Sequence, residues 1–233
     1  MKIVILTGAG VSAESGLGTF RDKDGLWTKY DLAEVATPEG FARDPVKVHD
    51  FYNARRANAA EADPNPAHYA LARLASQFAG DVVLITQNVD DLHERAGQDA
   101  IHMHGALTRA KCAICDARWQ APLQMSAAAP CPTCSEPATR PDIVWFGEIP
   151  EFMDEIEMHL TTAELFVAIG TSGQVYPAAG FVAEAARAGA ATLEINLEPS
   201  DISGLFDARR IGPASEAVPA WVDDMLEGVK FQG

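Results

Sequence analysis

Residues 3–13 read Ile-Val-Ile-Leu-Thr-Gly-Ala-Gly-Val-Ser-Ala, an apolar run that ends in glycines. The run predicts a buried strand, and a helix is expected to begin at the glycines. Gly8 and Gly10 allow the backbone to approach a ligand closely, and free N–H groups at a helix N-terminus stabilise a phosphate. A tight turn that binds nothing is the alternative. Because the turn directly follows a buried strand, we favour dinucleotide binding.

The rest of the chain continues this alternation of strand and helix. Three further apolar runs predict buried strands: 82–85, 165–169 and 192–196. Helical patterns are found at 44–62, 67–78, 177–187 and 217–229. The alternation predicts an α/β fold with a Rossmann-like doubly wound parallel sheet, whose ligands bind beyond the carboxyl ends of the strands. Small or polar residues follow each strand and are expected to converge on one cleft: Thr7-Gly8, Thr86-Gln87-Asn88, Gly170-Thr171-Ser172 and Asn196-Leu197-Glu198.

One element of an ordinary dehydrogenase is missing from this pattern. No strand ending in Asp or Glu follows the first glycines by about 20 residues. Residues 16–27 instead form a segment rich in glycine and aromatic residues, which we expect to close over the cofactor. Glu198, at the end of a later strand, is then the candidate for the ribose contact. The sequence therefore disfavours hydride transfer.

The four cysteines form two Cys-x-x-Cys pairs separated by 15 residues: Cys112, Cys115, Cys131 and Cys134. Two such pairs predict one structural zinc ion with four thiolate ligands, in a small inserted zinc-ribbon domain over residues 107–140. That segment has too few large apolar residues to fold alone. Two disulfides, with three possible connectivities, are the alternative. We expect no secretory leader, because glycine interrupts the first apolar run, and this favours zinc.

Composition predicts one large domain. The chain has 233 residues, of which 48% are hydrophobic and 22% charged, as in an ordinary globular protein. No uninterrupted apolar stretch is long enough to span a membrane, so we expect a cytoplasmic protein with no membrane partner. We also expect it to be monomeric. A formal charge of −15 argues against nucleic-acid binding. Solubility and the attraction of basic partners both account for this charge.

Short motifs in a specific order point to a family. They are Gly8-Ala9-Gly10-Val11-Ser12, Phe20-Arg21, Thr86-Gln87-Asn88-Val89-Asp90, His104-Gly105, the two cysteine pairs, Phe146-Gly147-Glu148, Gly170-Thr171-Ser172 and Asn196-Leu197-Glu198. In this order the chain resembles the sirtuins over nearly its whole length, and most closely the bacterial CobB-type, class III NAD-dependent protein-lysine deacylases. The resemblance implies a single catalytic domain over 1–233. Its large Rossmann-like lobe would comprise about 1–30, 80–106 and 141–233, and its small lobe a helical insertion at about 31–79 and the zinc module at about 107–140.

The resemblance also implies a reaction. NAD and an acylated lysine of a protein would enter the cleft from opposite sides, and the acyl group would pass to ADP-ribose as nicotinamide leaves. NAD is then a consumed co-substrate. A mono-ADP-ribosyltransferase that uses the same NAD site, and a module that binds NAD without turnover, are the alternatives.

Residue roles follow from the same resemblance. The implied catalytic residues are His104, Gln87, Asn88 and Asp90. The implied NAD contacts are Gly8, Ala9, Gly10, Ser12, Phe20, Arg21, Trp27, Gln87, Asn88, Val89, Asp90, Gly170, Thr171, Ser172, Asn196, Leu197, Glu198 and Ala214. His104 would be the base, and an unperturbed imidazole pKa of about 6.5 suits that role. His102, two residues earlier on the same strand face, is the competing candidate, and Gly105 favours His104.

The acyl group has its own candidates. Tyr52 and Arg55 lie one turn apart in a helical pattern, where a hydroxyl and a guanidinium can bind a carboxylate. This Tyr-x-x-Arg resembles the acyl-selectivity pair of class III sirtuins, so we expect desuccinylation and demalonylation alongside weaker deacetylation. A surface arginine stacked on a tyrosine is the alternative. Val144 and Phe146 belong to an apolar segment that, in the family, pairs with the substrate peptide as an added strand.

Overall fold

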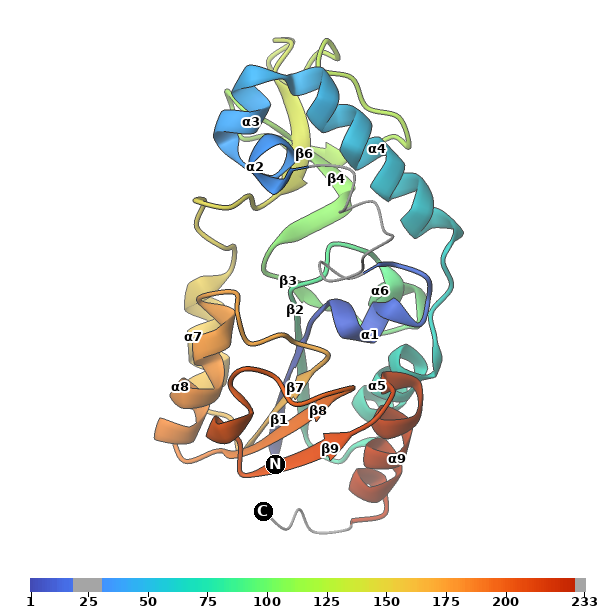
Figure 1. Ribbon diagram of the computed structural model, residues 1–233, viewed down its shortest axis with the longest axis vertical. Helices are drawn as coiled ribbons and strands as arrows, with labels where there is room; N and C mark the ends of the chain where they lie inside the picture. Colours follow the sequence, from blue (N-terminus) through green and yellow to red (C-terminus); the bar gives the residue numbers. More distant parts are fainter. Residues whose placement is uncertain (19–30, 229–233) are drawn as a thin grey trace.

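The computed structural model describes residues 1–18 and 31–228, which form two lobes placed one above the other (Figure 1). The larger lobe is built on a six-stranded sheet in the order β3-β2-β1-β7-β8-β9, and every neighbouring pair is parallel. Its strands are β1 (Lys2–Thr7), β2 (Asp81–Thr86), β3 (Ile101–His102), β7 (Leu165–Ile169), β8 (Ala191–Asn196) and β9 (Ala208–Ile211). The Rossmann-like parallel sheet is therefore confirmed.

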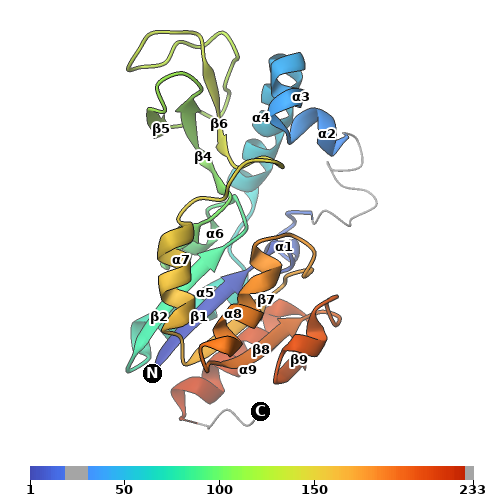
Figure 2. The ribbon, with the colours of Figure 1, turned by 90° about the vertical axis from the view of Figure 1, so that its left-hand side faces the viewer.

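Helices cover both faces of this sheet. Helices α5 (Pro66–Gln77) and α9 (Ala214–Leu226) pack together on one face, and α7 (Met153–Thr161) and α8 (Phe181–Arg187) cover the other (Figure 2). Alternate residues of β1 supply the two cores: Ile3 and Ile5 pack with α5 and α9, whereas Val4 and Leu6 pack with α7 and α8. Because both faces are buried, the strand has no polar face and is apolar from Ile3 to Leu6.

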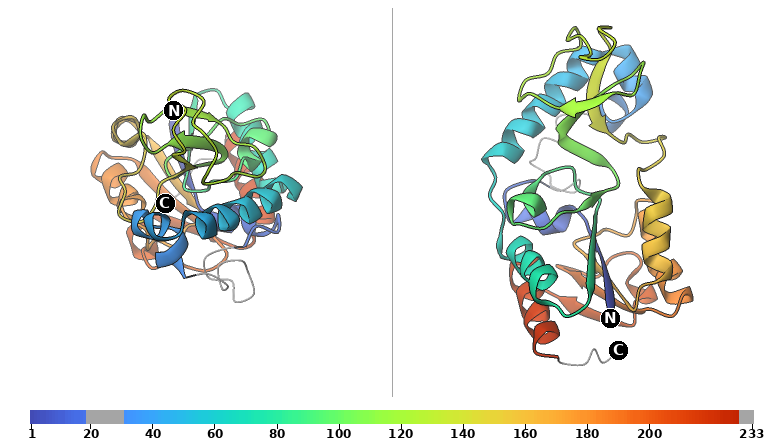
Figure 3. Two further views of the ribbon diagram at one scale, coloured as in Figure 1. Left: turned by 90° about the horizontal axis from the view of Figure 1, so that it is seen from above. Right: turned by 180° about the vertical axis from the view of Figure 1, so that it is seen from behind.

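The smaller lobe combines helices with a second sheet (Figure 3). Strands β4 (Gly105–Cys112), β5 (Arg118–Gln120) and β6 (Thr139–Ile143) pair antiparallel in the order β5-β4-β6. Beside them lie α2 (Leu32–Val35), α3 (Pro38–Arg43) and α4 (Pro45–Glu61). Buried Arg56 of α4 donates to the Leu107 carbonyl at 2.7 Å and to the Asn53 side chain at 2.9 Å. The bond to Leu107 attaches α4 to β4, and the bond to Asn53 lies within α4.

Helix α5 differs from the lobe division expected from the sequence. The expected helical insertion extends to about residue 79, but α5 packs on α9 and the large sheet. Leu71 and Leu74 are buried there beside Trp221. The insertion therefore ends before α5. Short helices α1 (Ala9–Ala13) and α6 (Leu92–Arg95) and the 3-10 turns Ala178–Gly180 and Ser203–Leu205 complete the fold. Within the described residues, no helix combines the length and apolarity that a membrane span requires.

Candidate active site between the two lobes

The strand ends of the large sheet converge on one cavity of about 1120 Å³, which the small lobe lines from the other side. Every described NAD, catalytic and acyl-group candidate lines it: Gly8, Ala9, Gly10, Ser12, Tyr52, Arg55, Gln87, Asn88, Val89, Asp90, His104, Val144, Phe146, Gly170, Thr171, Ser172, Asn196, Leu197, Glu198 and Ala214. The convergence expected from the sequence is therefore observed. Phe20, Arg21 and Trp27 lie outside the described residues.

The first glycine turn packs directly on the turn after β7. The Gly8 amide donates to the Ile169 carbonyl at 3.0 Å, and the Gly10 amide to the Gly170 carbonyl at 2.9 Å. A Cβ on Gly10 would lie only 2.7 Å from the Gly170 Cα. The glycines are thus required by close backbone packing within the chain, in addition to any ligand. Since α1 has only five residues and its Gly10 and Val11 amides already donate within the chain, neither a long-helix dipole nor those two amides would hold a phosphate here.

The loop after β2 is attached to the first glycine turn. The Asn88 side chain donates to the Gly8 carbonyl and to the Ser12 hydroxyl, each at 3.1 Å. The Asn88 amide donates to the Thr86 hydroxyl at 3.0 Å. Asn88 therefore holds the two loops in a fixed relation at the cavity wall.

Asp90 is a buried carboxylate at the same wall. Its Oδ1 accepts from the Leu92 amide at 3.2 Å. Burial raises the pKa of Asp90, opposed by that hydrogen bond, by Ser12 and by the charge of Arg55. Asp90 thus places a carboxyl group in the part of the cavity that Arg55 also faces.

His104 has one ring nitrogen engaged and one available. Its Nδ1 lies 3.2 Å from the Gln87 carbonyl, which can only accept a hydrogen bond, so Nδ1 carries the proton. Nε2 is then an unprotonated acceptor on a residue that lines the cavity. Burial lowers the pKa of His104, opposed by the bond to Gln87. The neutral imidazole needed for a base is therefore the favoured form near neutral pH.

His102 has both ring nitrogens engaged away from the cavity. Nδ1 lies 3.1 Å from the Asn88 carbonyl, and Nε2 lies 2.9 Å from Glu94 Oε1. The prediction that His102 and His104 lie on the same face of one strand is wrong, because β3 ends at His102 and His104 lies in the turn before β4. His102 supports the Asn88 loop, and only His104 of the two lines the cavity.

The His102–Glu94 pair should make stability depend on pH. Burial alone would lower the pKa of His102, but the hydrogen bond and charge of Glu94 raise it above its ordinary value. Burial would raise the pKa of Glu94, yet His102 lowers it overall. The histidine contribution is complete below about pH 6.5 and is lost as pH rises through the raised pKa. The glutamate contribution is complete above about pH 4.3 and is lost as pH falls through the lowered pKa.

We therefore expect His102→Gln to reduce the free energy of unfolding most between about pH 4.3 and 6.5. The difference from the unmodified protein should shrink as pH rises above that window. Urea unfolding of both proteins over a pH series measures it. A difference that is constant across the series would contradict the assignment of this pair.

Tyr52 and Arg55 lie together on α4 and line the cavity from the small lobe. The Arg55 guanidinium carbon lies 5.7 Å from the Tyr52 ring centroid, and the Tyr52 side chain is almost fully buried. The charge of Arg55 acts on the hydroxyl of Tyr52 and on Asp90. The expected face of α4 therefore does supply a cation and a hydroxyl to the cavity.

The segment proposed to pair with a peptide, residues 144–146, already donates hydrogen bonds from its backbone amides to other groups of the chain. The amides of Val144 and Phe146 donate to the carbonyls of His104 and Ala36, at 3.0 and 2.9 Å. The Trp145 amide donates to Glu148 at 2.8 Å. Among the residues that the structure describes, no donor reaches the Val144 or Phe146 carbonyl, so an added strand would pair with these oxygens. Phe146 is half exposed beside them.

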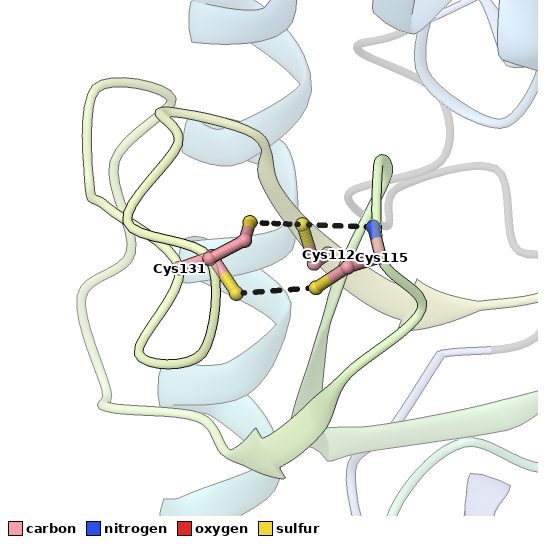
Figure 4. Close-up of side chains that lie close together, drawn as sticks. Cys112, Cys115 and Cys131 are labelled. Carbon is pink, nitrogen blue, oxygen red and sulfur yellow. Dashed lines mark hydrogen bonds between the residues drawn. The ribbon is translucent and has the colours of Figure 1, made fainter.

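The four cysteines form one cluster in the small lobe (Figure 4). Cys112 and Cys134 sulfurs are 3.6 Å apart, and those of Cys115 and Cys131 are 3.7 Å apart. Sulfurs bound tetrahedrally to zinc at about 2.3 Å are separated by about 3.8 Å, whereas a disulfide bond measures about 2.05 Å. The cluster fits a single zinc ion, and the disulfide alternative does not fit it.

Backbone amides support the same thiolates. The Ile114 amide donates to Cys112 Sγ at 3.4 Å, and the Thr133 amide donates to Cys131 Sγ at 3.3 Å. Such bonds stabilise negative charge on sulfur, the form that binds metal. The cysteines lie outside the cavity lining, so the ion would be structural.

Other cavity residues were not singled out from the sequence. They are Asn58, Leu107, Trp145, Gln174, Tyr176, Ser200 and Pro213, among others. They lie in loops, on a helix or, for Leu107, in strand β4, and they share no spacing with the motifs. The position of Trp145 between Val144 and Phe146 could have indicated a cavity residue, but this apolar segment is equally consistent with a place in the hydrophobic core.

Comparison with known proteins agrees with this architecture. The Sir2 family model matches residues 8–177. A Caulobacter vibrioides protein named NAD-dependent protein deacylase is 61% identical over 231 residues, which cover 97% of each chain. An Escherichia coli protein of the same name is 50% identical over 233 residues, covering 98% of this chain and 84% of the relative.

Solved structures give the same result. A Sir2 homologue in complex with NAD has a TM-score of 0.89 at 38% identity, covering 98% of this chain and 91% of that chain. A mutant Sir2 homologue in complex with ADP-ribose has a TM-score of 0.90 at 38% identity and covers 99% of this chain. Sequence and fold thus agree over nearly the full length, and the chain belongs to the Sir2 family.

Proposed function

We propose that this protein is an NAD-dependent protein-lysine deacylase that transfers the acyl group from lysine to ADP-ribose and releases nicotinamide. One observation carries the proposal: a single cavity holds the ends of the parallel strands, His104 with an available Nε2, and the Tyr52–Arg55 pair. The relatives named NAD-dependent protein deacylase and the Sir2 homologue bound to NAD support it.

The strand-end residues would hold NAD. The turn at Gly8, Ala9 and Gly10 lies beside Thr171 and Ser172, and its backbone would approach the phosphates. Asn196, Glu198 and Ala214 line the same cavity, and we expect them to contact the adenosine half of NAD. NAD supplies an ADP-ribosyl acceptor and a nicotinamide leaving group.

The remaining cavity residues would position the two substrates and accept a proton from a hydroxyl group. Gln87, Asn88 and Asp90 lie on one fixed loop, so amide and carboxylate groups can orient ribose hydroxyls and the leaving amide. His104 Nε2 would accept the proton that a hydroxyl must lose, and its lowered pKa keeps that nitrogen unprotonated. The zinc ion would hold the small lobe and supply no chemistry at the cavity.

We also propose a preference for acyl chains that end in a carboxylate. Arg55 and Tyr52 offer charge-assisted hydrogen bonds to succinyl or malonyl groups. An acetyl methyl would leave Arg55 without a ligand charge, which makes deacetylation the weaker activity. We also propose that the enzyme is monomeric and cytoplasmic and that it acts on proteins.

Arg55→Met should lower the ratio of desuccinylation to deacetylation by about tenfold or more, because a hydrogen bond to a charged group contributes about 1.5–3 kcal/mol. Matched acetyl- and succinyl-lysine peptides measure this ratio as kcat/KM. Exposed Arg187, at the end of α8, provides the control variant Arg187→Met. An unchanged ratio in Arg55→Met would refute the proposed preference.

Product analysis separates deacylation from mono-ADP-ribosyl transfer. The protein is incubated with NAD and acetyl-, succinyl- or crotonyl-lysine peptides, and the products are weighed by mass spectrometry. We expect free lysine peptide together with O-acyl-ADP-ribose. ADP-ribose attached to protein, with the acyl-lysine intact, would instead indicate the transferase, which the relatives' names do not favour. NAD binding without turnover would indicate a sensing module.

A further inference from the structure

A tryptophan adjoins the proposed acyl-selectivity pair. The Trp145 indole Nε1 donates a hydrogen bond to the Tyr52 hydroxyl at 3.0 Å. Trp145 is 3% exposed and Tyr52 is 1% exposed, yet both line the cavity. A bond this well shielded from water is strong and fixes the relative orientation of the two groups.

The hydrogen bond from Trp145 determines whether the Tyr52 hydroxyl donates or accepts toward a ligand. An indole N–H only donates, so the Tyr52 oxygen acts as acceptor toward Trp145 and its single hydrogen must point elsewhere. Arg55, on the same helix, adds a positive charge beside this oxygen. Within residues 1–18 and 31–228, no group accepts the hydroxyl hydrogen. The hydroxyl therefore faces a ligand as a donor.

Tyr52 keeps that hydrogen at neutral pH. Burial raises the pKa of its hydroxyl above the ordinary value, although the charge of Arg55 and the bond from Trp145 act in the opposite direction. A protonated phenol with its acceptor side filled suits a carboxylate, because an ionised carboxylate only accepts hydrogen bonds.

Trp145 is itself held in place. The Arg140 guanidinium carbon stacks 3.5 Å from the Trp145 ring centroid. Arg140 forms two hydrogen bonds with Glu148, at 2.8 and 2.9 Å, and Glu148 accepts the Trp145 amide at 2.8 Å. The indole therefore cannot turn away from Tyr52 without disrupting the largely buried ion pair between Arg140 and Glu148.

We infer that Trp145 is a specificity-determining positioning residue, which holds the Tyr52 hydroxyl as a donor toward the terminal carboxylate of the acyl chain. The inference deepens the proposed deacylase function and rests on it. Loss of the indole N–H would let the hydroxyl hydrogen rotate, and the phenol would be a weaker donor because the bond from Trp145 no longer polarises it. Neutral acyl chains, which offer no carboxylate, should be indifferent to this change.

Trp145→Phe tests the inference, because it removes the N–H and keeps an aromatic ring. We expect kcat/KM for a succinyl-lysine peptide to fall by about threefold to tenfold, less than a full charge-assisted hydrogen bond because Arg55 remains. The fall should lie in KM, since the contact is made before and during reaction. Activity on the matched acetyl peptide should fall much less, so the succinyl/acetyl ratio of kcat/KM should drop.

A double-mutant cycle isolates the route through Tyr52. Tyr52→Phe alone should lower succinyl activity at least as much as Trp145→Phe, and Trp145→Phe should cause no further loss in the Tyr52→Phe background. If Trp145→Phe folds poorly by thermal melting, a benzothienyl analogue of tryptophan at position 145 keeps the ring shape and replaces the N–H by sulfur.

Trp221 provides a matched control. It is as buried as Trp145 but lies in α9 of the large lobe, and its indole nitrogen has no hydrogen-bond partner among the described residues. Trp221→Phe should leave the succinyl/acetyl ratio unchanged.

Two results would overturn the inference while leaving the deacylase function standing: an equal fall for succinyl and acetyl peptides in Trp145→Phe, or an undiminished effect of Trp145→Phe in the Tyr52→Phe background. Failure of the unmodified protein to deacylate any peptide with NAD would overturn the proposed function itself, and the inference with it.

Discussion

His104→Ala is expected to lower kcat/KM for NAD-dependent deacylation by about 100- to 10,000-fold, the usual contribution of a positioned base. The physical reason is the geometry of the imidazole, whose Nδ1 is fixed by the Gln87 carbonyl and whose Nε2 is left as the acceptor. Peptide assays give the rate, and calorimetric titration should show that NAD still binds. The melting temperature should change little, because the ring makes one hydrogen bond among the described residues, to the Gln87 carbonyl.

The pH profile provides a second readout of the same base. Because burial lowers the pKa of His104, the acid limb of kcat/KM in the unmodified protein should lie below about pH 6.5. Below that limb Nε2 is protonated and cannot accept a proton. His102→Gln is the control and should retain most of the activity, since both of its nitrogens are engaged away from the cavity. Full activity in His104→Ala, with loss in the His102 variant, would reverse the assignment.

Removing the metal is expected to unfold the zinc-bearing part of the small lobe. Structural zinc binds zinc-finger peptides with about 10–16 kcal/mol, as much as the whole stability of an average domain. Chelation, or Cys131→Ser, should therefore abolish protection from hydrogen exchange over residues 107–140. Deacylation should be lost as well, because β4 and β6 lead directly into His104 and Val144. Returning zinc after chelation should restore both.

The metal experiment has a matched control. Thr133→Ala changes a residue between two ligands but keeps the backbone amide that donates to Cys131 Sγ, so metal content and exchange should be unaffected. Elemental analysis should find one zinc ion per chain. Four thiols should become alkylated when the protein is denatured with chelator and no reductant. Absence of zinc together with no reactive thiols would establish two disulfides and refute the metal site.

Much of the large lobe could be predicted because its strands are buried on both faces. Strands β1, β2, β7 and β8 all lie where an apolar run occurs in the sequence. Strand β9 could not be found in this way. It lies at the sheet edge, and two arginines interrupt its apolar residues. Its pairing with β8 comes from a tertiary contact and not from a pattern of its own.

The small lobe was less predictable. Strand β5 has three residues, two of them exposed, and depends on β4 for its hydrogen bonds. The position of α5 also could not be derived, because its apolar face fits either lobe and only packing on α9 shows which one it joins. The cysteine spacing did predict the metal cluster, since two short knuckles fix the ligands locally.

The sequence by itself determined the parallel sheet, the shared position of its strand ends and the cysteine cluster, because periodicity and short spacing act between near neighbours in the chain. Only the tertiary structure decided which histidine has an available nitrogen and which way the Tyr52 hydroxyl donates. Those properties depend on single hydrogen-bond partners such as Glu94, Gln87 and Trp145, and the last lies 93 residues from Tyr52. No local pattern specifies such a partner, since its position is set by how distant segments pack.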